Sequence, residues 1–181
     1  MLIVRFYQAH AVTLPKQGGS YTEGMVGSPQ YINPILALNN DVDLDLTHLI
    51  FQGLYRVNEK GEIVPGLVAH TETSGDGKTY IMTLREGAQW HDNKPITAND
   101  VVFTFERILD PDSQSPLYKT FRDLRVAAVN DRTVQMTLSE PYAPFLSTLT
   151  VGILPQHLWA EIPASNTTLA EYNVKPVGSG S

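Results

Sequence analysis

The chain has 181 residues, with 13 Lys+Arg against 19 Asp+Glu, a formal charge of −6, and 42% apolar residues. That apolar content is enough for a packed core and argues against disorder. The acidic balance argues against a nucleic-acid-binding protein, because phosphate recognition needs a concentrated basic face. The absence of Cys excludes disulfides, thiolate catalysis, Cys-ligated zinc and iron–sulfur clusters. No apolar run is long enough to span a bilayer.

The N-terminal part of the chain has little regular patterning. Residues 1–17 are expected to form an extended or disordered segment. Arg5 and His10 interrupt its apolar stretch, so the pattern does not match a signal peptide. Residues 15–34 are rich in Gly, Pro and Ser, which is typical of loops. One short strand is predicted within them, since three residues alternate there with small or polar ones: Tyr21, Glu23 and Met25.

A helical pattern follows between Asp41 and Tyr55. Apolar residues recur there at helical spacing: Leu46, Leu49, Ile50 and Leu54. Asp43 or Asp45 is expected to cap the first turn, because a carboxylate can accept the free N–H groups at a helix start. Gly53 suits the left-handed position that often ends a helix.

Two turns and one strand are predicted next. The Asn-Glu-Lys-Gly run at 58–61 and the Ser-Gly-Asp-Gly run at 74–77 both have turn composition. After the second turn, large apolar residues alternate along the chain, with partly apolar residues between them: Tyr80, Met82 and Leu84. This pattern predicts a strand with both faces partly covered.

A second helix is predicted from about Thr97. Thr97 and Asp100 have capping-box spacing, with Asp in the usual Glu or Gln place. The apolar residues after them fall on one helical face: Val101, Val102, Phe105, Ile108 and Leu109. The helix is expected to end at Asp110-Pro111, because the residue before a proline disfavours helical geometry.

The segments 126–129 and 133–138 flank Asn130-Asp131-Arg132, which predicts a β-hairpin. The chain thus mixes hairpins, strands and separated helices without regular βαβ alternation. We therefore predict an α+β fold with a mixed sheet, hairpins and packed helices.

Two partial ligand motifs are incomplete. Residues 75–79 contain Gly-Lys-Thr, but Glu72 stands where a phosphate-binding loop needs Gly, and a strand follows rather than a helix. Asp41, Asp43 and Asp45 have the spacing of calcium-loop ligands, but the later positions that require Gly and Glu hold other residues. A β-turn and a helix N-terminus favoured by the helix dipole are the simpler interpretations.

Trp90-His91-Asp92 contains a local His-Asp pair of the kind that metal-dependent hydrolases use. No other histidine forms a His-x-x-x-His or Glu-flanked metal motif with it. The simpler interpretation is that Trp90 anchors a strand end in the core, while His91 and Asp92 shape the turn that follows. There is also no Gly-x-Ser-x-Gly nucleophile elbow.

A set of short motifs occurs in a characteristic order along most of the chain. The most specific runs from Leu84 to Val101 and includes Leu-Arg-Glu-Gly-Ala-Gln-Trp-His-Asp. The others lie at residues 53–55, 63–69, 76–80, 133–141, 154–159 and 175–180. With these motifs the chain resembles the family 5 extracellular solute-binding proteins of ABC importers, the oligopeptide-, dipeptide- and nickel-binding group. Glu72 and Asn93 depart from the residues that are frequent in the family.

The resemblance implies the N-terminal portion of a two-lobed, periplasmic-binding-protein-like fold. Residues 18–52 would begin the first lobe, residues 53–172 would form an extra α+β subdomain, and residues 173–181 would return to the first lobe. Such a protein is a non-catalytic receptor that closes two lobes around a solute. The implied partners are a small solute such as a peptide, the ABC permease and the second lobe of the same protein, and the implied location is periplasmic or extracellular at the cell surface. No cofactor is implied.

The resemblance also implies where a solute would be contacted. The corresponding positions are the loop before the first helix, Asn39, Asn40 and Asp41, and the aromatic segment after the capped helix, Leu117 and Tyr118. Peptide backbone would pair there with protein backbone, like an added strand. The alternatives are that Asn39 and Asn40 serve the turn into the helix and that Tyr118 is a packing aromatic. This chain alone is expected to bind solute weakly or not at all.

Two other functions stay open at this point. One is a metal-dependent hydrolase that uses His91 and Asp92. The other is a stand-alone interaction domain with no role in transport.

Overall fold

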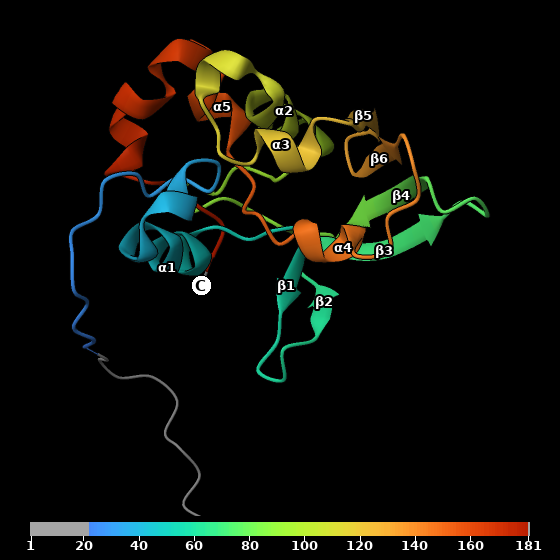
Figure 1. Ribbon diagram of the computed structural model, residues 1–181, viewed down its shortest axis with the longest axis horizontal. Coiled ribbons are helices and arrows are strands. Elements are labelled where there is room, and N and C mark those ends of the chain that lie inside the picture. The colour runs from blue at the N-terminus through green and yellow to red at the C-terminus, as the bar shows by residue number, and fades with distance from the viewer. Residues whose placement is uncertain (1–21, 181) are drawn as a thin grey trace, which may run out of the picture.

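The computed structural model describes residues 22–180, and Figure 1 shows them as a sheet body with a separate helix and a projecting hairpin. The expected α+β class is confirmed. The strands are β1 (Tyr55–Val57), β2 (Ile63–Pro65), β3 (Val68–Thr73), β4 (Thr79–Leu84), β5 (Leu124–Asn130) and β6 (Thr133–Leu138). The α-helices are α1 (Asp41–Ile50), α2 (Ala98–Leu109), α3 (Tyr118–Phe121), α4 (Phe145–Thr148) and α5 (Gln156–Trp159). Short 3-10 helices occur at Ala37–Asn39, Pro111–Ser113, Ala164–Leu169 and Glu171–Asn173.

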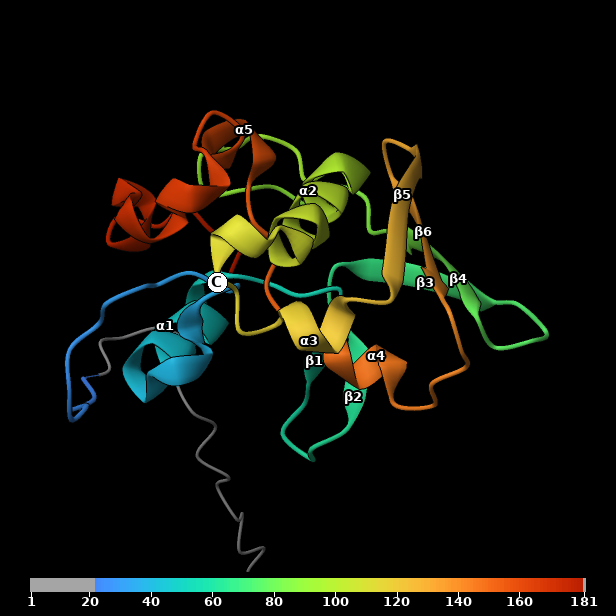
Figure 2. The same cartoon turned by 45° about the horizontal axis from the view of Figure 1, so that its top comes forward.

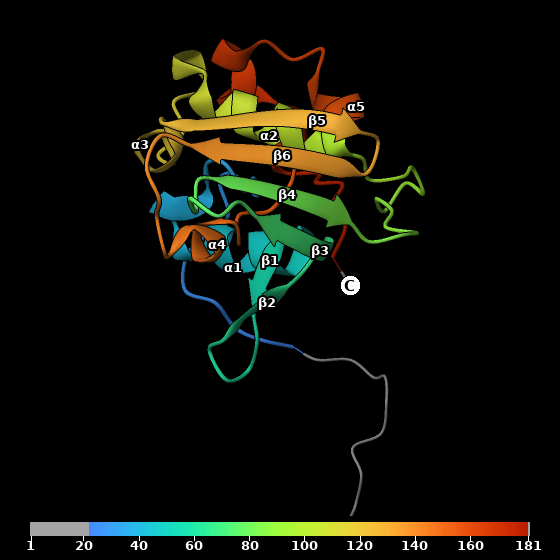
Figure 3. The same ribbon diagram turned by 90° about the vertical axis from the view of Figure 1, so that its right-hand side faces the viewer.

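The main sheet is antiparallel with strand order β3-β4-β6-β5, and Figure 3 shows its four strands side by side in front of α2. The predicted hairpin forms β5 and β6, with Val126 opposite Met136 and Ala128 opposite Val134. The predicted strand at 80–84 is β4, which pairs with β3 on one side and β6 on the other. The β3–β4 and β5–β6 pairs are each joined by a local turn, whereas β4 and β6 pair across a longer segment of chain that contains α2, α3 and β5.

One face of this sheet packs on α2 and forms the core. Alternate residues of β4 and β6 point into it, including Met82 and Met136, which are fully buried. From α2, Phe105 is fully buried and packs edge-on against Phe121, with ring centroids 5.0 Å apart. Burial of such side chains is worth about 1.5–3 kcal/mol each, so this sheet–helix contact is the main stabilising unit.

The predicted start and end of α2 are confirmed. The Asp100 carboxylate accepts the backbone N–H of Thr97 at 2.8 Å, which is the expected reciprocal cap. A second oxygen of Asp100 accepts the N–H of Gln156 at 2.9 Å, so the same carboxylate also holds the start of α5. The helix ends at Leu109, and Asp110 caps it immediately before Pro111.

The turn at 58–61 is also confirmed, and it joins β1 to β2. The Asn58 side-chain oxygen accepts the N–H groups of Lys60 and Glu62, each at 2.9 Å, and Gly61 has a φ of +78°. The resulting two-stranded hairpin projects from the body in Figure 2. Its residues Arg56 and Val57 are exposed, so one end of the hairpin borders solvent.

The first helix differs from the prediction in its ends and its buried face. The α1 cap is Asn40, whose side-chain oxygen accepts the N–H groups of Val42 and Asp43, whereas Asp43 or Asp45 was expected. The buried residues are Val42, Asp43 and Thr47, while Leu49 is 67% exposed. The backbone of Gly53 does not adopt the left-handed conformation. Gly53 instead forms an isolated antiparallel β-bridge with Gly152. The apolar spacing therefore identified the helix but not the side that is covered.

The strand predicted around Tyr21 and Met25 is wrong for the residues that the structure describes, because residues 22–25 form no strand. Neither sheet within residues 22–180 includes this segment. Tyr21 and the predicted extended segment 1–17 lie outside the described residues. Of the helices between residues 22 and 180, none has the length and apolar content that crossing a membrane requires.

The two rejected ligand motifs have structural roles. Asp43 is 1% exposed, and its two carboxylate oxygens accept the N–H groups of Gln30 at 2.7 Å and Tyr31 at 2.9 Å. Asp76 lies in the β3–β4 turn, where the hydroxyl of Ser74 and the N–H of Lys78 lower the pKa of its carboxyl. Asp43 thus holds the preceding segment at residues 30–31 against α1, whereas Asp76 accepts hydrogen bonds from its own turn.

Candidate functional site

Three segments that are far apart in sequence meet at the C-terminal end of α1. Gly53 pairs with Gly152, and the Ile153 N–H donates to the carbonyl of Gln52 at 3.0 Å. The third segment is Gly178–Gly180, and Figure 1 shows the C-terminal end of the chain beside α1. The chain segments that link α1 to the sheet body therefore lie side by side at the C-terminal end of α1.

The Gly178–Gly180 segment closes the end of α1. The N–H groups of Ser179 and Gly180 both donate to the carbonyl of Ile50, at 2.9 and 2.8 Å. A Cβ on Gly178 would lie 1.9 Å from that carbonyl oxygen, and a Cβ on Gly180 would lie 2.0 Å from the carbonyl oxygen of Leu49. Only glycine permits this approach, which gives the Gly-Ser-Gly motif a physical reason.

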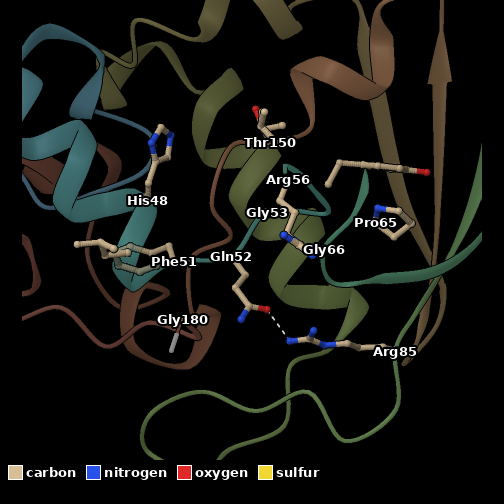
Figure 4. Close-up of a pocket in the computed structure, with 13 residues that line it drawn as sticks. His48, Phe51, Gln52, Gly53, Arg56, Pro65, Gly66, Arg85, Thr150 and Gly180 are labelled. Carbon is tan, nitrogen blue, oxygen red and sulfur yellow. Dashed lines mark hydrogen bonds between the residues drawn. The ribbon is translucent and has the colours of Figure 1, made fainter. Parts of the chain in front are cut away.

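A cavity of about 540 Å³ opens beside these segments, and Figure 4 shows the residues around it. It lies between the end of α1, the base of the β1–β2 hairpin and the loop after β4. Its lining residues are His48, Leu49, Phe51, Gln52, Gly53, Tyr55, Arg56, Val57, Pro65, Gly66, Arg85, Thr150 and Gly180. This volume falls in the range of small-molecule sites.

The charged residues of the lining are basic. Arg56 and Arg85 contribute two guanidinium groups from different elements, and the lining contains no Asp or Glu. The Arg85 guanidinium donates to the side-chain oxygen of Gln52 at 2.5 Å, as the dashed line in Figure 4 marks. Because Gln52 is neutral, it orients Arg85 without cancelling its charge. Such a cavity favours an anionic group, above all a carboxylate.

The predicted site residues Asn39, Asn40 and Asp41 lie at the opposite end of α1. Asn39 and Asp41 are exposed. The side chain of Asn40 is used by the protein itself, since it caps α1 and donates to the carbonyl of Ser28 at 3.1 Å. Asn39 and Asp41 are therefore free to contact a solute, whereas Asn40 mainly shapes the loop.

Leu117 and Tyr118 lie at the start of α3. The preceding Ser115 is buried, and its hydroxyl donates to the carbonyl of Ile35 at 2.7 Å. This bond ties the aromatic segment to the segment that leads into Asn39, so the structure brings the two predicted groups together. Leu117 is partly buried against the core, and Tyr118 is 40% exposed.

The cavity residues were not predicted as a site. A helix of ten residues is about 15 Å long, so Gln52 lies well away from Asn39. Arg85 stood in the most specific motif, and Gln52 directly precedes the predicted Gly53. Their pairing depends on a contact between residues 33 positions apart, which no local pattern indicates.

His91 and Asp92 do not converge on a common centre. The ring nitrogens of His91 face the backbone of Gly178 and Gly180. The Asp92 carboxylate instead receives Nε2 of His157 at 2.7 Å. Within residues 22–180 no group of three or more His, Asp or Glu side chains is placed to hold a metal ion. Trp90 is 2% exposed, as expected for a core anchor.

Residues 62–181 match the family described as bacterial extracellular solute-binding proteins, family 5, middle region. The chain belongs to this family of solute-binding proteins. The resemblance inferred from the motifs is therefore confirmed. Because the family gathers solute-binding proteins and not enzymes, the hydrolase interpretation of His91 and Asp92 is wrong.

Individual members of the family agree with this assignment. The oligopeptide-binding protein OppA of Bacillus subtilis is 35% identical over 138 residues, which cover 67% of this chain and 25% of OppA. CtaP of Listeria monocytogenes, an ABC transporter substrate-binding protein, superposes with a TM-score of 0.80 at 35% identity, over 91% of this chain and 34% of CtaP. AppA of Bacillus subtilis, solved with a nonapeptide, gives 0.80 at 27% identity, over 86% of this chain and 32% of AppA. The chain thus spans about a quarter to a third of the length of these relatives.

Proposed function

We propose that this chain is part of the solute-binding receptor of an ABC import system, and that the solute is a peptide or another small molecule. The observation that carries the proposal is family membership over residues 62–181. Relatives whose names refer to oligopeptide binding and to ABC transport support it. The receptor acts in the periplasm or outside the cell, at the cell surface, and delivers its solute to a permease.

The proposal assigns different tasks to different parts of the chain. Residues 18–52 and 173–181 belong to the first lobe, and residues 53–172 form the extra subdomain. The second lobe comes from further polypeptide, and the solute lies between the lobes. The tie between Ser115 and Ile35 supports this arrangement, because it holds the subdomain and the first-lobe loop in one surface.

The solute contacts we propose are the exposed parts of the two tied segments. Asn39 and Asp41 supply polar groups from the loop before α1, and Asn40 keeps that loop in shape. Tyr118 supplies an aromatic face, and the neighbouring Leu117 is partly buried against the core. The nonapeptide complex of the AppA relative supports a peptide as the occupant.

The basic cavity is a second place where a solute can be held. Arg56 and Arg85 fit a carboxylate, from a peptide C-terminus or an acidic side chain. A matched pair of peptides, identical except for a free or amidated C-terminus, distinguishes this contact from backbone pairing. Loss of the preference for the free carboxylate in Arg85→Gln, but not in the exposed control Arg122→Gln, would support it.

Calorimetry on the product of the complete gene tests the proposal. We expect peptides to bind with one site, Tyr118→Ala to weaken binding about tenfold, and Tyr142→Ala to leave it unchanged. Tyr142 is a matched control, because it is 49% exposed and lies before α4. The 181-residue chain alone is expected to bind weakly.

The outcomes separate the alternatives. Micromolar peptide binding by the 181-residue chain alone would contradict the need for a second lobe. Equal effects of Tyr118→Ala and Tyr142→Ala would remove the proposed site but not the function. A complete gene product that binds no small solute, and instead captures a protein, would favour the stand-alone interaction domain.

A further inference from the structure

His91 makes three contacts with the backbone of the Gly178–Gly180 segment. Its own N–H donates to the carbonyl of Gly178 at 2.8 Å. Its Nδ1 lies 3.3 Å from the amide nitrogen of Gly178, and its Nε2 lies 3.2 Å from the carbonyl oxygen of Gly180. Both ring nitrogens therefore face partners whose donor or acceptor character is fixed.

These partners determine the protonation state of the ring. The Gly178 amide is a donor, so Nδ1 must carry a lone pair and no proton. The Gly180 carbonyl is an acceptor, so Nε2 must carry the proton. Only the neutral imidazole with its proton on Nε2 satisfies both contacts. A second proton on Nδ1 would place two donors opposite each other and break the Gly178 contact.

We infer that His91 is a titratable positioning residue, which holds Gly178–Gly180 against α1 only as the neutral Nε2–H tautomer. This goes beyond the proposed function and does not depend on it. Histidine is the side chain that ordinarily exchanges its proton between about pH 5 and 8. His91 is exposed, so a proton reaches it directly from solvent.

The release of this segment would be felt at the end of α1 and in the cavity. Ser179 and Gly180 close the helix through the carbonyl of Ile50, and the Ser179 hydroxyl accepts the N–H of Gln52 at 3.2 Å. Gly180 itself lines the basic cavity. Protonation of His91 therefore loosens one wall of the cavity and the connection between α1 and the sheet body.

The charged groups on the adjoining elements have other partners or point to solvent. On the same turn, Asp92 is engaged by His157 of α5, and Lys94 is exposed. On the return segment Lys175 pairs with Glu171 at 3.6 Å, and on α1 the nearest titratable side chain is the exposed His48. None of these is hydrogen-bonded to the His91 ring within the described residues. Within the described residues, the hydrogen bonds of the His91 ring are thus those to the backbone of Gly178 and Gly180.

The first experiment needs no variant. Nitrogen-15 NMR of the histidine rings in the purified protein distinguishes a protonated from an unprotonated ring nitrogen. At pH 8 we expect His91 to show unprotonated Nδ1 and protonated Nε2. A spectrum with the proton on Nδ1, or with a mixture of both tautomers, would overturn the inference.

The second experiment follows the Gly178 amide by hydrogen exchange from pH 8 to pH 5, expressed as a protection factor. In the wild type we expect about fivefold loss of protection as the imidazole takes its second proton. In His91→Asn, whose amide oxygen stands at the place of Nδ1, protection should persist and not vary with pH. In His91→Gln, which can replace only Nε2, protection should be low throughout.

His70→Ala is the matched control, because His70 is an exposed histidine on β3 that pairs with Glu72. It should retain the wild-type pH profile at Gly178. A profile that stays flat in the wild type, or that is equal in the wild type and His91→Asn, would overturn the inference. Loss of protection at every amide in all His91 variants would show a general structural role instead.

Discussion

The sheet body and the α1 region are held together in different ways. In the sheet body, formed by β3–β6 and α2, two of the three strand pairs form through local turns and the helix covers one face. In the α1 region the contacts join residues that are far apart, such as Asn33 with Asn173 and Gln52 with Ser179. The first region rests mainly on apolar burial, whereas the second adds polar contacts and close backbone approach to its own buried apolar residues. Substitutions in the two regions should therefore differ in which part of the protein they destabilise and in how much stability they remove.

The largest effect is expected when a buried side chain of the sheet body is truncated. Phe105→Ala removes a fully buried ring that packs on Phe121, and such truncations cost about 3–5 kcal/mol. Chemical denaturation should show a lower midpoint for the whole protein, since this core supports every other element. Val129→Ala, at a residue that is 58% exposed on β5, is the control and should change stability by less than about 0.5 kcal/mol. A loss confined to α1 would contradict the comparison.

The next effect is expected from Gly178→Ala in the α1 region. The added methyl group would overlap the carbonyl of Ile50, and forced shifts of this kind cost about 1–3 kcal/mol. Thermal unfolding should move down by about 2–12 °C, and hydrogen exchange should accelerate first at the end of α1. Gly75→Ala is the matched control, because a Cβ there meets nothing within 4 Å. Equal effects of the two changes would show that the return segment does not restrain α1.

The smallest effect concerns the Asp92–His157 pair, which joins the turn after β4 to α5. Burial alone would raise the pKa of Asp92, but the hydrogen bonds from His157 and the Lys94 N–H outweigh it and lower the pKa below its ordinary value. A lowered pKa stabilises the fold above the unfolded value near 3.8 and loses that contribution as pH falls through the folded pKa.

Asp92→Asn should therefore cost about 0.5–1 kcal/mol at pH 5, and the difference from the wild type should shrink as the pH falls through the lowered pKa of Asp92. Urea unfolding of both proteins at several pH values measures this difference. Glu86→Gln, at a more exposed carboxylate 3.8 Å from Arg132, is the comparison and should cost less. A difference that grows as the pH falls would contradict the pairing of Asp92 with His157.

The sheet body could be predicted from local patterns apart from β3, for which no strand was predicted, and the α1 region only in part. Thr97 and Asp100 are three residues apart and determine the start of α2 between them, and the hairpin turn at 130–132 joins adjacent strands. The covered face of α1 depends instead on Asp43 receiving the N–H groups of Gln30 and Tyr31. A buried carboxylate gives no apolar signal, so the spacing of Leu46 and Leu49 indicated the wrong face.

The candidate site shows the same limit. The resemblance predicted contacts at Asn39–Asp41 and Tyr118, and in the structure a hydrogen bond from Ser115 to Ile35 joins the segments that carry them. The basic cavity was missed, because Arg56 and Arg85 come from separate elements and each is an ordinary surface residue in the sequence. The role of His91 was also hidden, because its partners are backbone atoms 87 and 89 positions away.

Native mass spectrometry of the complete gene product, purified without unfolding and then mixed with a peptide library, tests the central claim most directly. If the protein captures its solute without chemical change, each complex should carry one peptide whose mass is that of the intact compound. Peptide fragments, a covalent adduct, or a bare protein at every peptide concentration would contradict it.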